Sequence, residues 1–165
     1  MDRLILLRHG KAEPDSTSGD DFDRRLAARG EQESSEMGAR LADMGFAPDL
    51  ALVSPAARAR GTWEHAGAHF PNAQSRFDDG LYHADSAAIR HAVDKAAGEA
   101  RTLIVVGHNP GLQELTVQLL QEADASPSLI ARAQRNFPTA TAAVFLFDHD
   151  GKPHYDALYF PDRHH

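Results

Sequence analysis

A run of four apolar residues, Leu4 to Leu7, ends abruptly in Arg8, His9 and Gly10. Such a run is typical of a short strand that is buried on both faces, as in a sheet covered by helices. Gly10 lets the backbone turn after the strand without a steric penalty, because it has no Cβ. Ligands of open α/β sheets bind outside the carboxyl ends of the strands. The run therefore predicts the floor of a functional site, and the alternative is that both polar side chains only cap the strand at the surface.

A second apolar strand, Leu50–Val53, leads directly into Ser54 and Pro55. Serine followed by proline is typical of a helix start, with Ser54 as the N-cap and Pro55 in the first helical position. Arg58 then falls near the first turn, close to the carboxyl end of the strand. Arg60 lies two residues further on and points to another face of the helix. We expect Arg58 to face the pocket and Arg60 to face solvent.

A third apolar strand, Leu103–Val106, delivers His108 to its carboxyl end. In a doubly wound sheet such strand ends can converge on one crevice. There the guanidinium groups of Arg8 and Arg58 could bind phosphate oxygens in a bidentate manner. A histidine such as His9 could then attack phosphorus, because nearby arginines oppose its protonation and keep a lone pair available. The pattern predicts a phosphate site with a histidine nucleophile.

The remaining segments alternate between helical and extended patterns. Helices are predicted at 30–44, 55–69, 86–100 and 112–121, a short strand near Arg76 and Phe77, and a hairpin formed by 140–147 and 154–159. We expect the segment 125–138 to be an irregular connection. This order of elements predicts a single α/β domain over residues 1–165, in three layers, with a mostly parallel sheet and helices on both faces.

Composition excludes several functional classes. The net charge is −7 with no basic block, so nothing supports binding to nucleic acid. The chain has no cysteine and therefore no disulfide, thiol catalyst or thiolate metal site. No apolar run approaches the length of a membrane span, no signal-peptide pattern is present, and a cytoplasmic location is expected. The neighbouring Asp20, Asp21 and Asp23 are expected to form a solvated acidic surface.

Ten histidines raise the question of a metal site. His65 and His69 are four residues apart on a predicted helix, a spacing that can bind zinc, but no HExxH pattern accompanies them. We expect them to be surface histidines, and we expect neither metal nor cofactor. His164 and His165 end the chain and could be native or the remnant of a tag.

Three motifs in order resemble those of the histidine phosphatase (phosphoglycerate mutase-like) superfamily. Leu7–Gly10 resembles its RHG signature, and Ser54–Ala59 with Thr62 is similar to its second-arginine motif. Gly107–Gly111 resembles its second-histidine motif. A tripeptide alone recurs by chance, whereas three motifs in order, each at a strand end, are specific. The resemblance implies the phosphoglycerate mutase-like fold.

Within this superfamily the chain is most similar to the short SixA-type phosphohistidine phosphatases. It is small, it lacks a long inserted subdomain, and Asp23–Leu26 followed by Arg29 and Gly30 is similar to a segment of those proteins. A phosphatase that acts on phosphohistidine in a protein is therefore the first expectation.

The resemblance also implies roles for single residues. His9 would attack phosphorus and become phosphorylated, while Arg8 and Arg58 would hold the equatorial oxygens. His108 would be a second donor to the phosphoryl group. Water would then hydrolyse the intermediate without a metal ion.

The proton donor is where the chain departs from the family pattern. Many members place an acidic residue before the third strand, and here Asp78 and Asp79 occupy that region. Asp79 is the first candidate for the acid, with Asp78 and His83 behind it. The alternative is that both aspartates only shape a surface turn before Gly80.

Other functions compete with the first expectation. One is a phosphatase of small phosphate esters, and a mutase is less favoured because it needs a more enclosing lid than 165 residues offer. Another is a phosphate-binding or metal-binding module without catalysis. The expected partner is thus a phosphorylated protein or a small phosphorylated substrate, with neither nucleic acid nor membrane involved and the oligomeric state left open.

Overall fold

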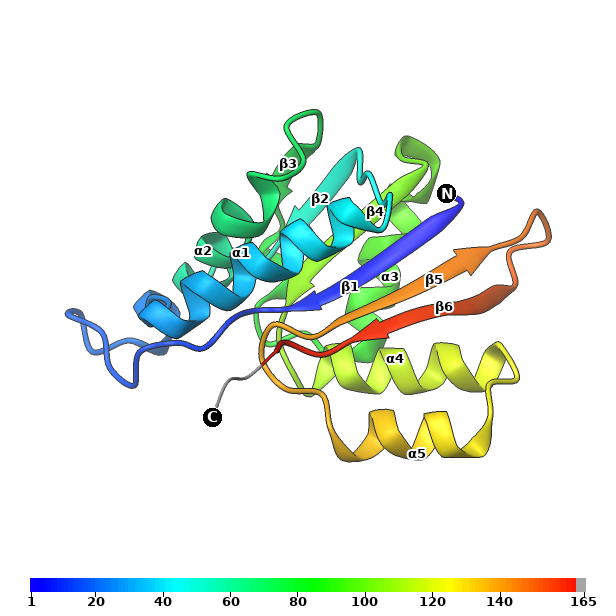
Figure 1. Cartoon of the computed structure of the whole chain (residues 1–165). Helices are drawn as coiled ribbons and strands as arrows, with labels where there is room; N and C mark the ends of the chain where they lie inside the picture. Colours follow the sequence, from blue (N-terminus) through cyan, green and yellow to red (C-terminus); the bar gives the residue numbers. More distant parts are fainter. Residues whose placement is uncertain (163–165) are drawn as a thin grey trace.

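A six-stranded sheet in the order β3-β2-β4-β1-β5-β6 forms the middle layer of the computed structural model, which describes residues 1–162 (Figure 1). Strands β1 to β4 run parallel, β5 is antiparallel to β1, and β6 is antiparallel to β5. The strands are β1 Arg3–Arg8, β2 Leu50–Val53, β3 Gln74–Phe77, β4 Thr102–Gly107, β5 Ala142–Phe147 and β6 Pro153–Tyr159. The predicted mostly parallel sheet is confirmed. His164 and His165 lie outside the described residues.

Helices cover both faces of the sheet, as predicted. One face carries α1 and α2, and the other carries α3 and α4 with α5 packed outside α4 (Figure 1). Their bounds are α1 Ala28–Asp43, α2 Ala57–Gly67, α3 Ser86–Ala96, α4 Gly111–Glu122 and α5 Pro127–Arg135. Three short 3-10 helices lie in the connections: η1 Asp21–Asp23, η2 Asp79–Leu81 and η3 Ala97–Glu99.

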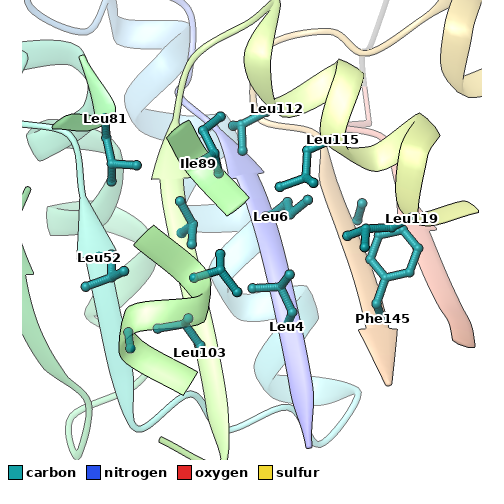
Figure 2. Close-up of a cluster of buried hydrophobic side chains, with 14 of the residues drawn as sticks. Leu4, Leu6, Leu52, Leu81, Ile89, Leu103, Leu112, Leu115, Leu119 and Phe145 are labelled. Carbon is teal, nitrogen blue, oxygen red and sulfur yellow. The ribbon is translucent and has the colours of Figure 1, made fainter. Parts of the chain in front are cut away.

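Strand β1 is buried on both faces. Leu4 and Leu6 join the core beneath α3 and α4, which Figure 2 shows, whereas Ile5 and Leu7 join the core beneath α1 and α2. Each of these four side chains is at most 1% exposed. Full burial of one such side chain stabilises a fold by about 1.5–3 kcal/mol. This explains why the run is apolar at every position rather than at alternate ones.

The prediction that 125–138 is irregular was wrong, because α5 occupies most of this segment. The Oγ atom of Ser126 accepts a hydrogen bond from the backbone N–H of Leu129, and Pro127 stands in the first turn. Ala133 is the buried residue of α5. The serine–proline start signal is therefore present, but nine residues with a short apolar stripe carry too little periodicity to reveal a helix.

The strand order places three functional strand ends side by side. Leu7 and Val53 both pair with Val106 of β4, so β1, β2 and β4 end at the same level. Beyond the strands, the backbone N–H of His9 still donates to the carbonyl of Gly107 at 3.0 Å. The first residues after each strand are therefore held in one row along the edge of the sheet.

The turn that follows His9 fits against the start of α1. A Cβ on Gly30 would lie 2.1 Å from the backbone oxygen of Lys11, and a Cβ on Gly10 would lie 2.7 Å from the backbone oxygen of Gly30. Backbone atoms cannot yield as a flexible side chain can. Glycine at both positions thus lets α1 approach the segment that carries His9.

Replacing Gly30 by alanine should therefore destabilise the fold. We expect Gly30→Ala to lower the free energy of unfolding by about 1–3 kcal/mol, as overpacking does in other cores. Gly98→Ala is the matched control, because a Cβ at Gly98 meets nothing within 4 Å. Urea denaturation of both variants measures the difference. Equal stability of the two variants would show that this close approach is not a constraint.

Candidate active site

Arg8, His9, Arg58 and His108 line one hollow of about 390 Å³ at the carboxyl ends of β1, β2 and β4. The other residues that line this hollow are Arg24, His83, Ala84, Asp85, Asn109 and Pro110. The structure thus brings together the four side chains that the sequence analysis placed in one site. We call this space the His9 hollow.

His9 is held as a neutral imidazole with one nitrogen available. Its Nδ1 lies 2.7 Å from the backbone oxygen of Gly10, which can only accept a hydrogen bond, so Nδ1 carries the proton and Nε2 keeps its lone pair. The pKa of His9 is lowered from 6.5 to about 3, mainly because the ring is buried; the bond to Gly10 opposes this shift, and His108, Arg8 and Arg58 add to it. A neutral imidazole with a free lone pair is the form that can attack phosphorus.

His108 is tied to Ser54. Its Nε2 lies 2.7 Å from Ser54 Oγ, and the rings of His108 and His9 are 5.1 Å apart. Burial lowers the pKa of His108 to about 4, with Arg58 acting in the same direction and Asp21 opposing it. His108 is therefore neutral at neutral pH.

Ser54 does not cap α2, contrary to the prediction. The helix begins at Ala57 with Ala56 in the cap position and no side-chain cap. The Oγ atom of Ser54 instead accepts from the backbone N–H of Ala56 at 3.4 Å and meets His108. With that donor in place the hydroxyl proton can point to Nε2, so Nδ1 of His108, which is buried and has no partner within residues 1–162, would carry an N–H.

The two arginines approach the hollow from different elements. Arg8 ends β1, and its Nη1 donates to the backbone oxygen of Phe137 at 2.9 Å. Arg58 lies in the first turn of α2 and is only 6% exposed, whereas Arg60 is exposed. The predicted orientation of these two arginines on the helix is confirmed.

Asp21 is the residue whose position the sequence analysis missed. Its carboxylate accepts from Nη2 of Arg58 at 3.0 Å and from the hydroxyl of Tyr82 at 2.7 Å, and it lies 3.1 Å from Nε of Arg24. The hydrogen bonds from Tyr82 and then Arg58 lower the pKa of Asp21. Asp20 and Asp21 are both exposed, as expected, but the prediction did not include the contacts of Asp21 with Arg58 and Tyr82. No local pattern relates position 21 to positions 58 and 82.

The structure does not bring Asp79 into the His9 hollow. Asp79 is exposed in η2, and Asp78 accepts from the backbone N–H of Gly80 at 2.9 Å and so shapes the turn. His83 does line the hollow, with a left-handed backbone (φ 61°) and its ring 3.9 Å from that of Tyr82. Of the three candidates for the acid, His83 is the one at the site.

Residues 1–162 contain neither a metal-ligand cluster nor a membrane-spanning helix. This part of the chain contains no group of three or more histidine, aspartate or glutamate side chains arranged to hold a metal ion. His65 lies 3.3 Å from a carboxylate oxygen of Glu31, and His69 lies 3.3 Å from the hydroxyl of Ser35. None of the described helices is long and apolar enough to cross a membrane.

The two buried neutral histidines should make stability depend on pH. The unfolded chain takes up these protons near pH 6.5, whereas folded His9 does so only near 3 and folded His108 near 4. Stability is therefore complete above the unfolded value and is lost as the pH falls, by up to about 1.4 kcal/mol per pH unit for each histidine. Urea denaturation between about pH 7 and pH 5 should show this fall. His9→Asn removes one titrating group while its amide can still donate to Gly10, so its slope should be shallower, and an unchanged slope would contradict the buried neutral state of His9.

Sequence comparison places the chain in a known family. The model of the histidine phosphatase superfamily (branch 1) matches residues 4–86. The chain is 34% identical over 139 residues to an uncharacterized protein of Mycobacterium tuberculosis, a match that covers 84% of this chain and 85% of the relative.

Solved structures extend the likeness over almost the whole chain. A protein of Agrobacterium tumefaciens that is provisionally assigned as the phosphohistidine phosphatase SixA superposes with a TM-score of 0.85 at 28% identity, covering 97% of this chain and 98% of that one. A similarly assigned protein of Nakamurella multipartitia gives 0.85 at 27% identity, with coverage of 97% and 96%. The protein histidine phosphatase SixA in complex with tungstate has the same fold, with a TM-score of 0.74 at 22% identity and coverage of 94% and 95%. With its motifs, its fold and these relatives, the chain belongs to the histidine phosphatase superfamily and resembles its SixA-type members.

Proposed function

We propose that this chain is a metal-independent phosphatase that removes the phosphoryl group from phosphohistidine in a protein, by way of a phosphorylated His9. The observation that carries the proposal is the state of His9. Its Nδ1 is bound to Gly10 at 2.7 Å, so Nε2 is a neutral nucleophile, and it shares the hollow with Arg8, Arg24 and Arg58. The similarity to two structures that are provisionally assigned as phosphohistidine phosphatases, at 28% and 27% identity, supports the choice of substrate.

The reaction then proceeds in two displacements at phosphorus. The Nε2 lone pair of His9 forms a bond to phosphorus while the bond from phosphorus to the substrate's imidazole nitrogen breaks. Arg8 and Arg58 hold the phosphoryl oxygens, where charge spreads in the transition state, and Nδ1–H of His108 donates to the same group. Water next attacks phosphorus, the bond to His9 breaks, and inorganic phosphate leaves.

The surroundings of the leaving group favour phosphohistidine as the substrate. Asp85 is the only carboxylate among the described residues that line the His9 hollow, and its Oδ1 accepts from the backbone N–H of Ala88 at 2.8 Å as the cap of α3. An imidazole can leave with a proton that it already carries, whereas an alkoxide needs one delivered. A hollow without an available carboxylic acid suits the first kind of leaving group better.

Hydrolysis of phosphate esters is a second candidate, and His83 is the observation that favours it. This side chain lines the His9 hollow, and an imidazole can both donate and accept a proton. It could protonate an ester oxygen during the first displacement and take a proton from water in the second. Esters would then be additional substrates of the same site.

The central experiment measures hydrolysis of a histidine-phosphorylated protein in the presence of a chelator. We expect wild-type enzyme to be active and to carry phosphate on His9 when it is rapidly quenched and analysed by mass spectrometry. His9→Ala should abolish turnover because no nucleophile remains. His91→Ala is the control, since His91 is an exposed histidine of α3. Substantial activity of His9→Ala, or loss of wild-type activity in the chelator, would refute the proposal.

The proton donor can be identified by comparing two substitutions on two substrates. His83→Asn keeps a residue type that tolerates the left-handed backbone, removes the imidazole, and should slow ester hydrolysis by roughly 10²–10⁴-fold. The same variant should hydrolyse phosphohistidine at nearly the wild-type rate. Asp79→Asn should leave both rates unchanged, because Asp79 lies outside the hollow. Loss of ester hydrolysis in Asp79→Asn alone would restore Asp79 as the acid.

A further inference from the structure

The guanidinium of Arg58 has one edge fully occupied by a single residue. Its Nη1 donates to the backbone oxygen of Asp21 at 2.9 Å, and its Nη2 donates to Oδ2 of the same residue at 3.0 Å. Its Nε is buried and has no hydrogen-bond partner within residues 1–162. Because the guanidinium is a rigid plane with five N–H groups, holding the outer edge also sets the direction of the edge that carries Nε.

Asp21 is itself held in place from several directions. The Tyr82 hydroxyl donates to Oδ2 at 2.7 Å, and Nε of Arg24 lies 3.1 Å from Oδ1. The ring of Phe22 packs edge-on against that of Tyr82 at 5.1 Å. These contacts join the long connection between β1 and α1, which Figure 1 shows projecting beyond the sheet, to the connection between β3 and α3. The carboxylate of Asp21 therefore links the β1–α1 connection, the β3–α3 connection and Arg58.

We propose that Asp21 is a positioning residue, which fixes the guanidinium of Arg58 beside the His9 hollow, where an oxyanion would bind. The inference rests on the proposed function for the identity of that oxyanion as a phosphoryl group. Tyr82 has a supporting role, because it restrains the carboxylate that restrains Arg58. Nothing in the local sequence indicates such a role for an aspartate in a polar connection.

Two opposing effects decide what Asp21 does to oxyanion binding. Its negative charge repels an anion, but the side chain is 48% exposed and is paired with both Arg58 and Arg24, so solvent and these cations screen the repulsion. Without Asp21, the long side chain of Arg58 would have to be ordered each time an anion binds. Orientation therefore outweighs repulsion, and Asp21 should strengthen oxyanion binding.

Tungstate binding to the purified protein, measured by isothermal titration calorimetry, tests this inference without requiring turnover. Asp21→Asn keeps the shape of the side chain and removes its charge. We expect roughly tenfold weaker tungstate binding, because a guanidinium of Arg58 that is no longer held in place contacts the anion less well. Asp20→Asn is the matched control, since Asp20 is an exposed neighbour whose side chain makes no cap hydrogen bond, and it should bind tungstate as wild type does. Unchanged or tighter binding by Asp21→Asn would overturn the inference, and tighter binding would identify Asp21 as a competitor for Arg58.

A double-mutant cycle separates positioning from a general loss of structure. If Asp21 acts through Arg58, then Asp21→Asn should have no further effect in an Arg58→Ala background. An equal loss in both backgrounds would overturn the inference. Tyr82→Phe leaves the pair of Asp21 with Arg58 intact and should weaken tungstate binding less than Asp21→Asn does, while a larger loss would assign the main role to Tyr82. These binding measurements do not test the proposed function, which is tested by the turnover of wild-type enzyme and His9→Ala.

Discussion

The site depends on the burial of β1 in the middle of the sheet. This strand is hydrogen-bonded to β4 on one side and to β5 on the other, and its apolar side chains fill the cores beneath both layers of helices. A strand constrained in every direction delivers its last residues to a defined point. His9 then needs only one further hydrogen bond, to Gly10, to set its tautomer and orientation. The orientation of His9, the proposed nucleophile, is thus set by packing that lies outside the hollow.

The electrostatics of the hollow follow from the same packing. Two arginines near two histidines would repel a proton from either imidazole, but burial is the largest cause of both lowered pKa values. The protein thereby keeps both rings neutral while the guanidinium groups stay charged. A neutral nucleophile beside fixed cations suits a dianionic phosphoryl group, because its charge is met by donors that need no rearrangement.

Sequence patterns within a single strand or helix correctly predicted where the site residues of that strand or helix lie. Apolar runs indicate β1, β2 and β4, and helical spacing correctly separates Arg58 from Arg60. Such patterns could not predict contacts between side chains of different strands, helices and connections. Serine is a residue type typical of helix N-caps, yet the hydroxyl of Ser54 lies 2.7 Å from Nε2 of His108, fifty-four positions away in the chain. The partners of Asp21 likewise come from α2 and from the connection after β3, so local polarity alone indicated solvent.

The connection between β3 and α3 shows why the acid was hard to assign from sequence. Asp78 forms its turn, Tyr82 holds Asp21, and His83 lines the hollow. Only the last of these positions lines the hollow, although the two neighbouring aspartates are the residues that chemistry alone would select. Because the turn at Asp78 and the left-handed backbone at His83 redirect the chain within a few residues, backbone geometry rather than acidity decides which side chain of this connection lines the hollow.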